Sequence, residues 1–165
     1  MKGLLDQFWT WFGTTPEIYA QTGVGNNVSV IYLEGRGDIT YHAEECDFLY
    51  FEELICGAKK IIDENIMDDV AIDQLLTIMA LDNGAELVRE YIEDKSTHEQ
   101  FEKIIHKGIY HMQSEARWQI AELIYRKRPE GYIEYLQILL KMKILTSENE
   151  LITVSRISKT RGKKD

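Results

Sequence analysis

From about residue 45 onward, apolar residues recur three or four positions apart, which is the spacing of one face of an α-helix. The segment that begins at Ser114 shows the pattern most fully, because a capping residue is followed by apolar positions at helical spacing. Segments beginning at Asp69 and, more weakly, at Ser147 share this rhythm. After an amphipathic segment that starts near Asp47, the pattern predicts helices over 69–80, 84–94, 97–111, 114–127, 130–142 and 147–157. Short turn and cap signals separate them, as is typical of antiparallel neighbours in a bundle or a stack of hairpins.

The first 44 residues have a different pattern. Residues 4–12 predict a short aromatic helix that ends at Gly13. The runs 28–33 and 39–42 are rich in β-branched and aromatic residues and flank the glycine-rich segment 34–38, which predicts a β-hairpin. We therefore expect a mostly α chain with a small N-terminal β-hairpin.

These elements predict one domain over residues 1–157, since domains run roughly 100–200 residues. Within it, residues 1–44 hold the aromatic helix and hairpin, and residues 45–157 hold the helical repeats. Residues 158–165 are expected to form a flexible basic tail.

Part of the chain resembles a known repeat family. Residues 68–157 resemble HEAT-like helical repeats, chiefly through the run Glu115-Ala116-Arg117-Trp118-Gln119-Ile120-Ala121-Glu122-Leu123-Ile124. The three segment starts are 45 and 33 residues apart, so the period is irregular. The resemblance implies a HEAT-like stack of antiparallel helices, and such stacks usually bind partners rather than catalyse reactions.

Charge is unevenly distributed along the sequence. The net formal charge is −9, and residues 156–165 contribute five basic residues and one acid, or +4, so residues 1–155 carry −13. An acidic body repels phosphate backbones and attracts basic partners, which favours a protein partner and argues against direct binding of nucleic acid. The same charge is about equally expected of a soluble domain without a basic partner.

The sequence also predicts a cytoplasmic protein. No apolar run approaches the roughly 20 residues that span a bilayer, so we expect no membrane association. The N-terminus has an acid where a signal peptide would be apolar. Cys46 and Cys56 lie about 15 Å apart if they share a helix, too far to bridge.

A small acidic chain of this layout is similar to immunity proteins of bacterial polymorphic-toxin and contact-dependent growth inhibition systems. That resemblance rests on overall character and implies a protein that binds and neutralises a toxin domain by steric occlusion. The acidic charge favours a cationic nuclease as the toxin. The alternative is a helical-repeat adaptor or regulatory protein-binding module without a toxin.

Two sets of residues are candidates for partner binding. Carboxylates on the predicted helices 69–80 and 84–94 form an acidic strip suited to a basic partner, or else an ordinary solvated helix face: Asp69, Asp73, Glu86, Glu90, Glu93 and Asp94. Trp118 and Tyr125 lie nearly opposite the main apolar face of helix 114–127. They either anchor a partner or pack against a neighbouring helix, and packing is favoured about two to one.

We expect no enzyme, cofactor or metal site. His98, His106 and His111 are not paired at the one-turn spacing of a helical metal site, and surface or turn positions are expected for them. No nucleophile or separated acid and base stands out. DNA glycosylases that use HEAT-like stacks need a strongly basic face, which this acidic sequence does not provide.

Overall fold

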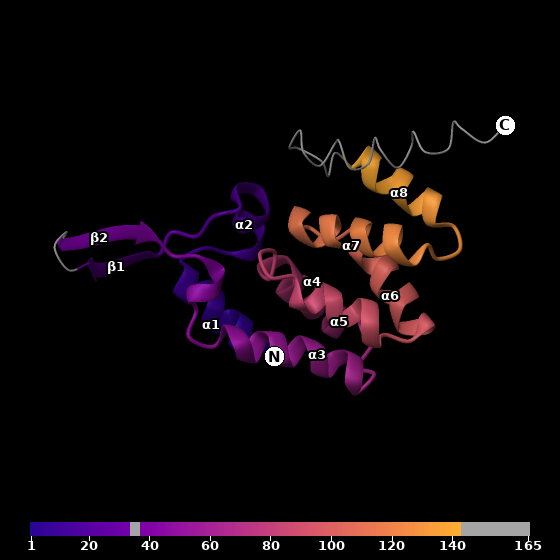
Figure 1. The fold of residues 1–165 in the computed structure, drawn as a ribbon, viewed down its shortest axis with the longest axis horizontal. Helices are drawn as coiled ribbons and strands as arrows, with labels where there is room; N and C mark the ends of the chain where they lie inside the picture. The colour runs from indigo at the N-terminus through magenta and orange to yellow at the C-terminus, as the bar shows by residue number, and fades with distance from the viewer. Residues whose placement is uncertain (34–36, 143–165) are drawn as a thin grey trace.

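The structure is a computed structural model that describes residues 1–33 and 37–142. Within these ranges the chain is mostly helical, as predicted (Figure 1). The α-helices are α1 (Lys2–Phe12), α2 (Pro16–Thr22), α3 (Phe51–Asp63), α4 (Asp69–Leu81), α5 (Leu87–Lys95), α6 (His98–Gly108), α7 (Ser114–Lys127) and α8 (Tyr132–Lys141); a 3₁₀ turn, η1 (Glu45–Asp47), precedes α3. The expected helix 147–157 and basic tail 158–165 lie outside the described residues.

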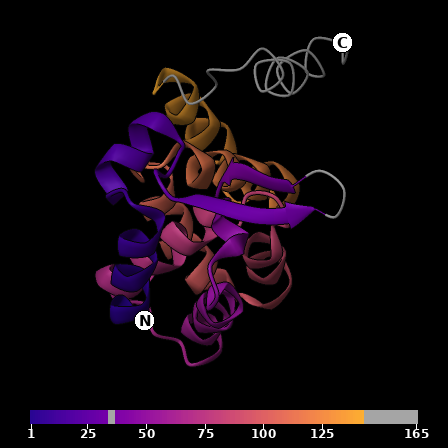
Figure 2. The same cartoon turned by 90° about the vertical axis from the view of Figure 1, so that its left-hand side faces the viewer.

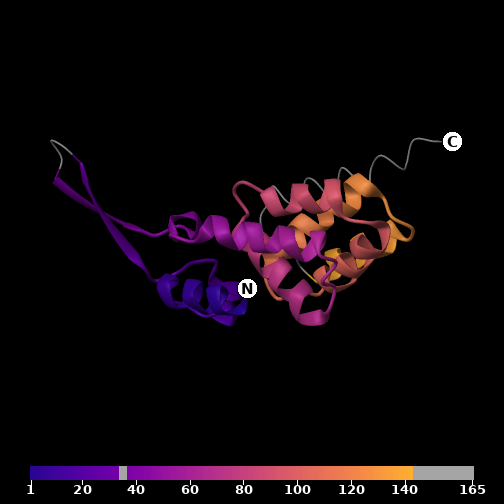
Figure 3. The ribbon, with the colours of Figure 1, turned by 90° about the horizontal axis from the view of Figure 1, so that it is seen from below.

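Strands β1 (Val28–Leu33) and β2 (Gly37–His42) pair antiparallel, with Val28 opposite His42 and Leu33 opposite Gly37. The second strand begins two residues before the expected run at Ile39. Figures 1 and 3 show the pair projecting away from the helices, and Figure 2 shows it crossing in front of them when the molecule is viewed from that side.

Local sequence signals account for several helix boundaries. Helix α1 ends at Gly13, whose φ of 70° is the left-handed conformation that glycine adopts without strain. The Asp68 carboxylate caps α4 by accepting from the backbone N–H groups of Val70 and Ala71. Thr97 and Gln100 form a capping box at the start of α6. These caps satisfy backbone donors that the first helical turns leave without intrahelical partners.

Helix α5 begins later than expected. The sequence pattern placed its start at residue 84, but the structure starts it at Leu87 because Glu86 takes a left-handed conformation with a φ of 56°. The Asp82 carboxylate then caps the helix by accepting from the Val88 N–H at 2.8 Å. The apolar spacing of this segment predicts that Leu87, Val88 and Ile92 face the core; Val88 and Ile92 are fully buried, whereas Leu87 is exposed.

The core lies around α4 and α7. Helix α4 contacts α3, α5, α6 and α7, and α7 contacts α4, α5, α6 and α8. Both helices are therefore enclosed by neighbours, and the α4 side chains of Leu75, Leu76, Ile78 and Met79 are fully buried. At the α6–α7 crossing, a Cβ on Gly108 would lie 2.5 Å from the Ile120 side chain, so only glycine permits this approach.

An aromatic cluster joins the first helix to the segment before α3. Phe8 packs edge-on against Phe48 with ring centroids 5.4 Å apart, and Phe12 and Trp9 both pack against Tyr19. The Tyr19 hydroxyl donates to a Glu45 carboxylate oxygen at 2.6 Å. This cluster fixes α1 and α2 beside the helical body and so positions the groove described below.

Candidate partner-binding surfaces

The four candidate carboxylates around α5 lie together, but three of them are held in ion pairs with Arg89 or Lys95. Arg89 is buried among them, and its guanidinium donates to Glu86 at 2.6 Å and to Glu93 at 3.2 Å. Arg126 of α7 lies 3.9 Å from Glu93, and Lys95 pairs with Asp94 at 2.9 Å. The Lys95 ammonium also lowers the pKa of Asp94, which keeps that carboxylate charged.

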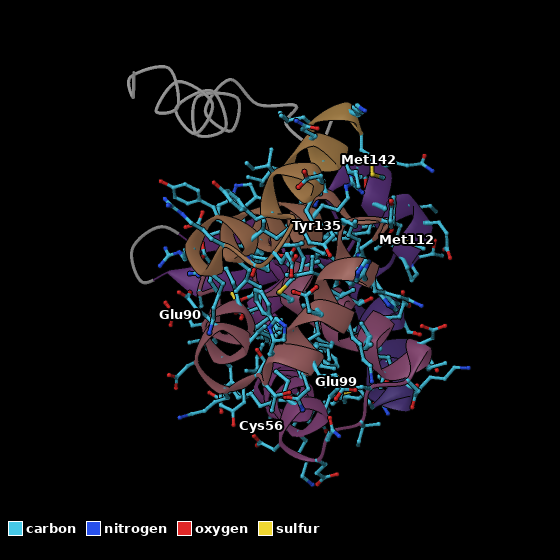
Figure 4. The ribbon with its side chains drawn as sticks, turned by 90° about the vertical axis from the view of Figure 1, so that its right-hand side faces the viewer. Cys56, Glu90, Glu99, Met112, Tyr135 and Met142 are labelled. Carbon is cyan, nitrogen blue, oxygen red and sulfur yellow. The ribbon has the colours of Figure 1, made fainter. Side chains whose placement is uncertain are left out.

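Arg126 pairs more closely with Glu122, at 2.8 Å, so five carboxylates and three cations leave this region, which we call the α5 surface, with a formal charge of −2. Glu86 and Glu93 are half-buried, while Glu90 and Asp94 face solvent (Figure 4 labels Glu90). Sequence reasoning missed Arg89. The signal was present, because glutamates three residues before it and four residues after it are at the spacings that form ion pairs along one helix face.

Asp69 and Asp73 lie at the other end of the helical body. Asp69 pairs with Lys107 at the end of α6, and Asp73 lies 3.8 Å from the His111 imidazole just before α7. Glu93, by contrast, approaches Arg126 near the end of α7. Twelve residues of α7 separate these ends, which is about 18 Å at 1.5 Å per residue. The structure therefore separates the expected strip into two surfaces.

The two candidate aromatic residues of α7 differ in accessibility. Trp118 is half-buried, while Tyr125 is 40% exposed with the Arg128 guanidinium over its ring at 5.7 Å. On the main apolar face, Ala116, Ile120 and Leu123 are fully buried. Tyr125 is therefore the more accessible of the two.

A groove of about 600 Å³ lies beside Asp73, between the first two helices and α4. We call it the N-terminal groove. Its floor is formed by four buried side chains, Leu5, Trp9, Thr77 and His111. Its walls carry Lys2, Asp6, Glu17 and Asp73 together with the exposed apolar residues Val70 and Met112. Figure 4 shows Met112 next to the purple N-terminal segment.

The turn that holds Met112 is fixed by α7. One Arg117 guanidinium nitrogen donates to the carbonyl oxygens of His111 and Met112 at 2.6 and 2.7 Å. The Gln113 N–H donates to Nδ1 of His111 at 3.3 Å. These bonds hold the floor and one wall of the groove in place without a partner.

His111 lies in the turn before α7, one of the two positions expected for it, but it is buried and forms a neutral part of the groove floor. Burial lowers its pKa to about 4, and Arg117 and Lys107 add to this effect while Asp73 opposes it. Since Nδ1 accepts from Gln113, the neutral ring carries its proton on Nε2, which lies 3.5 Å from the Thr77 hydroxyl. In this tautomer Nε2 has no lone pair with which to deprotonate Thr77, so the pair does not form a nucleophile and base.

Two further observations concern metals and membranes. Among residues 1–33 and 37–142, no three histidine, cysteine or carboxylate side chains converge as metal ligands would. Within the same ranges, no helix has the length and apolar character needed to cross a bilayer.

Comparisons of the chain with family models, curated proteins and solved structures find no match.

Proposed function

We propose that this chain is an immunity protein that binds a basic toxin domain and occludes it sterically. The charge of residues 1–155 supports the proposal, because a body of −13 attracts a cationic partner and speeds their encounter. A protein that acts in this way needs only a complementary surface.

The proposal includes a HEAT-like arrangement of α3 to α8. Helix α4 contacts α7 although α5 and α6 intervene in the sequence, and α7 also contacts α8. Such contacts between successive helical layers are what a stack of helical hairpins requires. We propose that the hairpins present the N-terminal groove and the α5 surface at two ends of one acidic body.

The N-terminal groove is the observation that carries the proposal. It places Asp6, Glu17 and Asp73 beside two exposed apolar side chains, which combines charge attraction with apolar surface to bury. The α5 surface is less suited to this role because Arg89 and Lys95 already hold Glu86, Glu93 and Asp94 in ion pairs. Its solvent-facing carboxylates Glu90 and Asp94 attract the basic partner during approach. Tyr125, near the same end, offers a second contact for the bound partner.

A growth experiment tests the proposed function. Cells expressing the C-terminal domain of the protein encoded directly upstream are grown with and without this chain. We expect this domain to arrest growth, the chain to restore it, and the two proteins to form a stable one-to-one complex. Arrest without rescue, or no toxic neighbour, would contradict the toxin connection and favour the adaptor function.

A further inference from the structure

The N-terminal groove combines three features and, of the candidate residues that the sequence suggested, includes Asp73. It has a floor of buried side chains, an excess of carboxylates on its walls and exposed apolar residues at its edge. We propose that it receives a basic side chain, lysine or arginine, from an aliphatic segment of a protein partner. This inference rests on the proposed function, since it names the chemistry that the partner brings to the site.

Charge complementarity selects a basic occupant. Three carboxylates, those of Asp6, Glu17 and Asp73, line the groove with the single amine of Lys2, which leaves a formal charge of −2. His111 on the floor is uncharged at neutral pH and does not reduce this excess. Lys107 lies near this end of the molecule but pairs with Asp69 at 3.2 Å. A phosphate or an acidic peptide would therefore be repelled.

The exposed apolar residues of the groove favour aliphatic groups next to the basic group of the partner. Val70 and Met112 on the groove wall are 64% and 50% exposed. The buried side chains of Trp9 and Leu5 line the same groove. Lysine and arginine bury their methylene stems along apolar surface while the charged end reaches polar groups. Methionine adapts its shape to such stems and to flanking aliphatic side chains.

The polar groups on the groove walls also favour an occupant that donates hydrogen bonds. A guanidinium or ammonium group donates hydrogen bonds and accepts none, so it suits the carboxylates of the walls. The volume of about 600 Å³ accommodates one long side chain with its neighbours.

The test titrates the full chain with a synthetic peptide, Gly-Ile-Arg-Leu-Lys-Met-Gly. Binding is measured from the backbone amide NMR shifts of Thr14, Val70 and Met112. We expect saturable shifts at these amides with a dissociation constant of about 1 mM or tighter. The acidic counterpart, Gly-Ile-Glu-Leu-Asp-Met-Gly, should leave them unchanged. Absence of shifts at roughly 10 mM peptide, or equal shifts with both peptides, would overturn the inference.

Charge variants locate the binding. Asp6→Lys with Glu17→Lys should weaken the basic peptide roughly tenfold, while Glu130→Lys with Glu134→Lys, an equal charge change on exposed residues outside the groove, should have little effect. Asp6→Asn with Glu17→Gln is the milder pair if the reversal disturbs folding, and roughly threefold weakening is expected. Equal weakening by the groove and control pairs would contradict a specific site.

Two measurements separate this inference from its premise. Peptide binding without growth rescue would support the groove as a site for basic side chains and would contradict the proposed immunity function. Growth rescue without groove-specific peptide binding would support the proposed function and would contradict the groove as the site that receives a basic side chain. Sedimentation tests whether the chain associates with itself. If it does, and the Asp6→Lys and Glu17→Lys pair abolishes this association, the occupant is a second copy of this chain and the inference is overturned.

Discussion

Acidification should destabilise this protein through His111. The ring is buried and its pKa is lowered to about 4, whereas an unfolded histidine titrates near its ordinary value of 6.5. As the pH falls below 6.5, the unfolded chain therefore takes up a proton that the folded protein does not bind until the pH approaches 4. Stability contributed by the neutral ring is fully present above pH 6.5 and is lost between these values.

The size of the effect follows from the two pKa values. Between pH 7 and pH 5 the linkage relation gives a loss of about 2 kcal/mol from this single group. That is a substantial part of the roughly 5–15 kcal/mol that stabilises an ordinary domain. For a chain of this length it corresponds to a fall of about 4–8 °C in the melting temperature.

Urea unfolding at pH 7 and pH 5 measures the effect, with His111→Asn as the comparison. The asparagine side-chain oxygen reaches toward the position of Nδ1 and can accept from the Gln113 N–H, but the amide does not titrate in this range. The loss between the two pH values should be about 2 kcal/mol smaller in the variant than in the wild type, whatever their difference at pH 7. An equal loss in both proteins would refute the assignment of His111 as a buried neutral ring.

Three further variants test the packing and the caps by urea unfolding. Gly108→Ala should cost about 1–3 kcal/mol because its Cβ meets Ile120, whereas Gly84→Ala, with no atom within 4 Å of its Cβ, should change little; equal costs would contradict the α6–α7 approach. Asp82→Ala should cost about 1–2 kcal/mol by removing the acceptor for the Val88 N–H, and Asp82→Asn should retain most of the stability. Arg89→Met should cost roughly 2–3 kcal/mol because it leaves Glu86 and Glu93 without their buried cation, and a cost near zero would show that these pairs contribute little.

Helix type and approximate position were predictable from the sequence because they depend on local periodicity. The pattern that begins at Ser114 placed α7 at its observed bounds, and Asp69 marks the observed start of α4. The start of α5 was not predictable in the same way. It depends on the left-handed conformation of Glu86 and on a cap from Asp82, four residues earlier, and neither feature changes the apolar spacing.

The candidate surfaces were harder to predict because they depend on which helix ends meet. Counting carboxylates along two helices treated Asp73 and Glu93 as neighbours, whereas contacts with His111 and Arg126 place them near opposite ends of α7. The groove was absent from the sequence reasoning for the same reason. Its walls come from α1, the start of α2, α4 and the turn before α7, and no short sequence window contains all four.

The position of the charges decides how a basic partner would approach. Arg89 and Arg126 satisfy Glu86 and Glu93 within the protein, so reversing these two glutamates to lysine would place like charges beside the arginines and destabilise α5. A steering test on the α5 surface should therefore neutralise the solvent-facing pair with Glu90→Gln and Asp94→Asn, because Arg89 lies 3.8 Å from Glu90 and Lys95 lies 2.9 Å from Asp94. With both residues changed, we expect the C-terminal domain of the protein encoded upstream to associate more slowly at low salt, with an unchanged dissociation rate. Variants at the groove should instead raise the dissociation rate, since contacts that bury apolar surface act after the partner has docked.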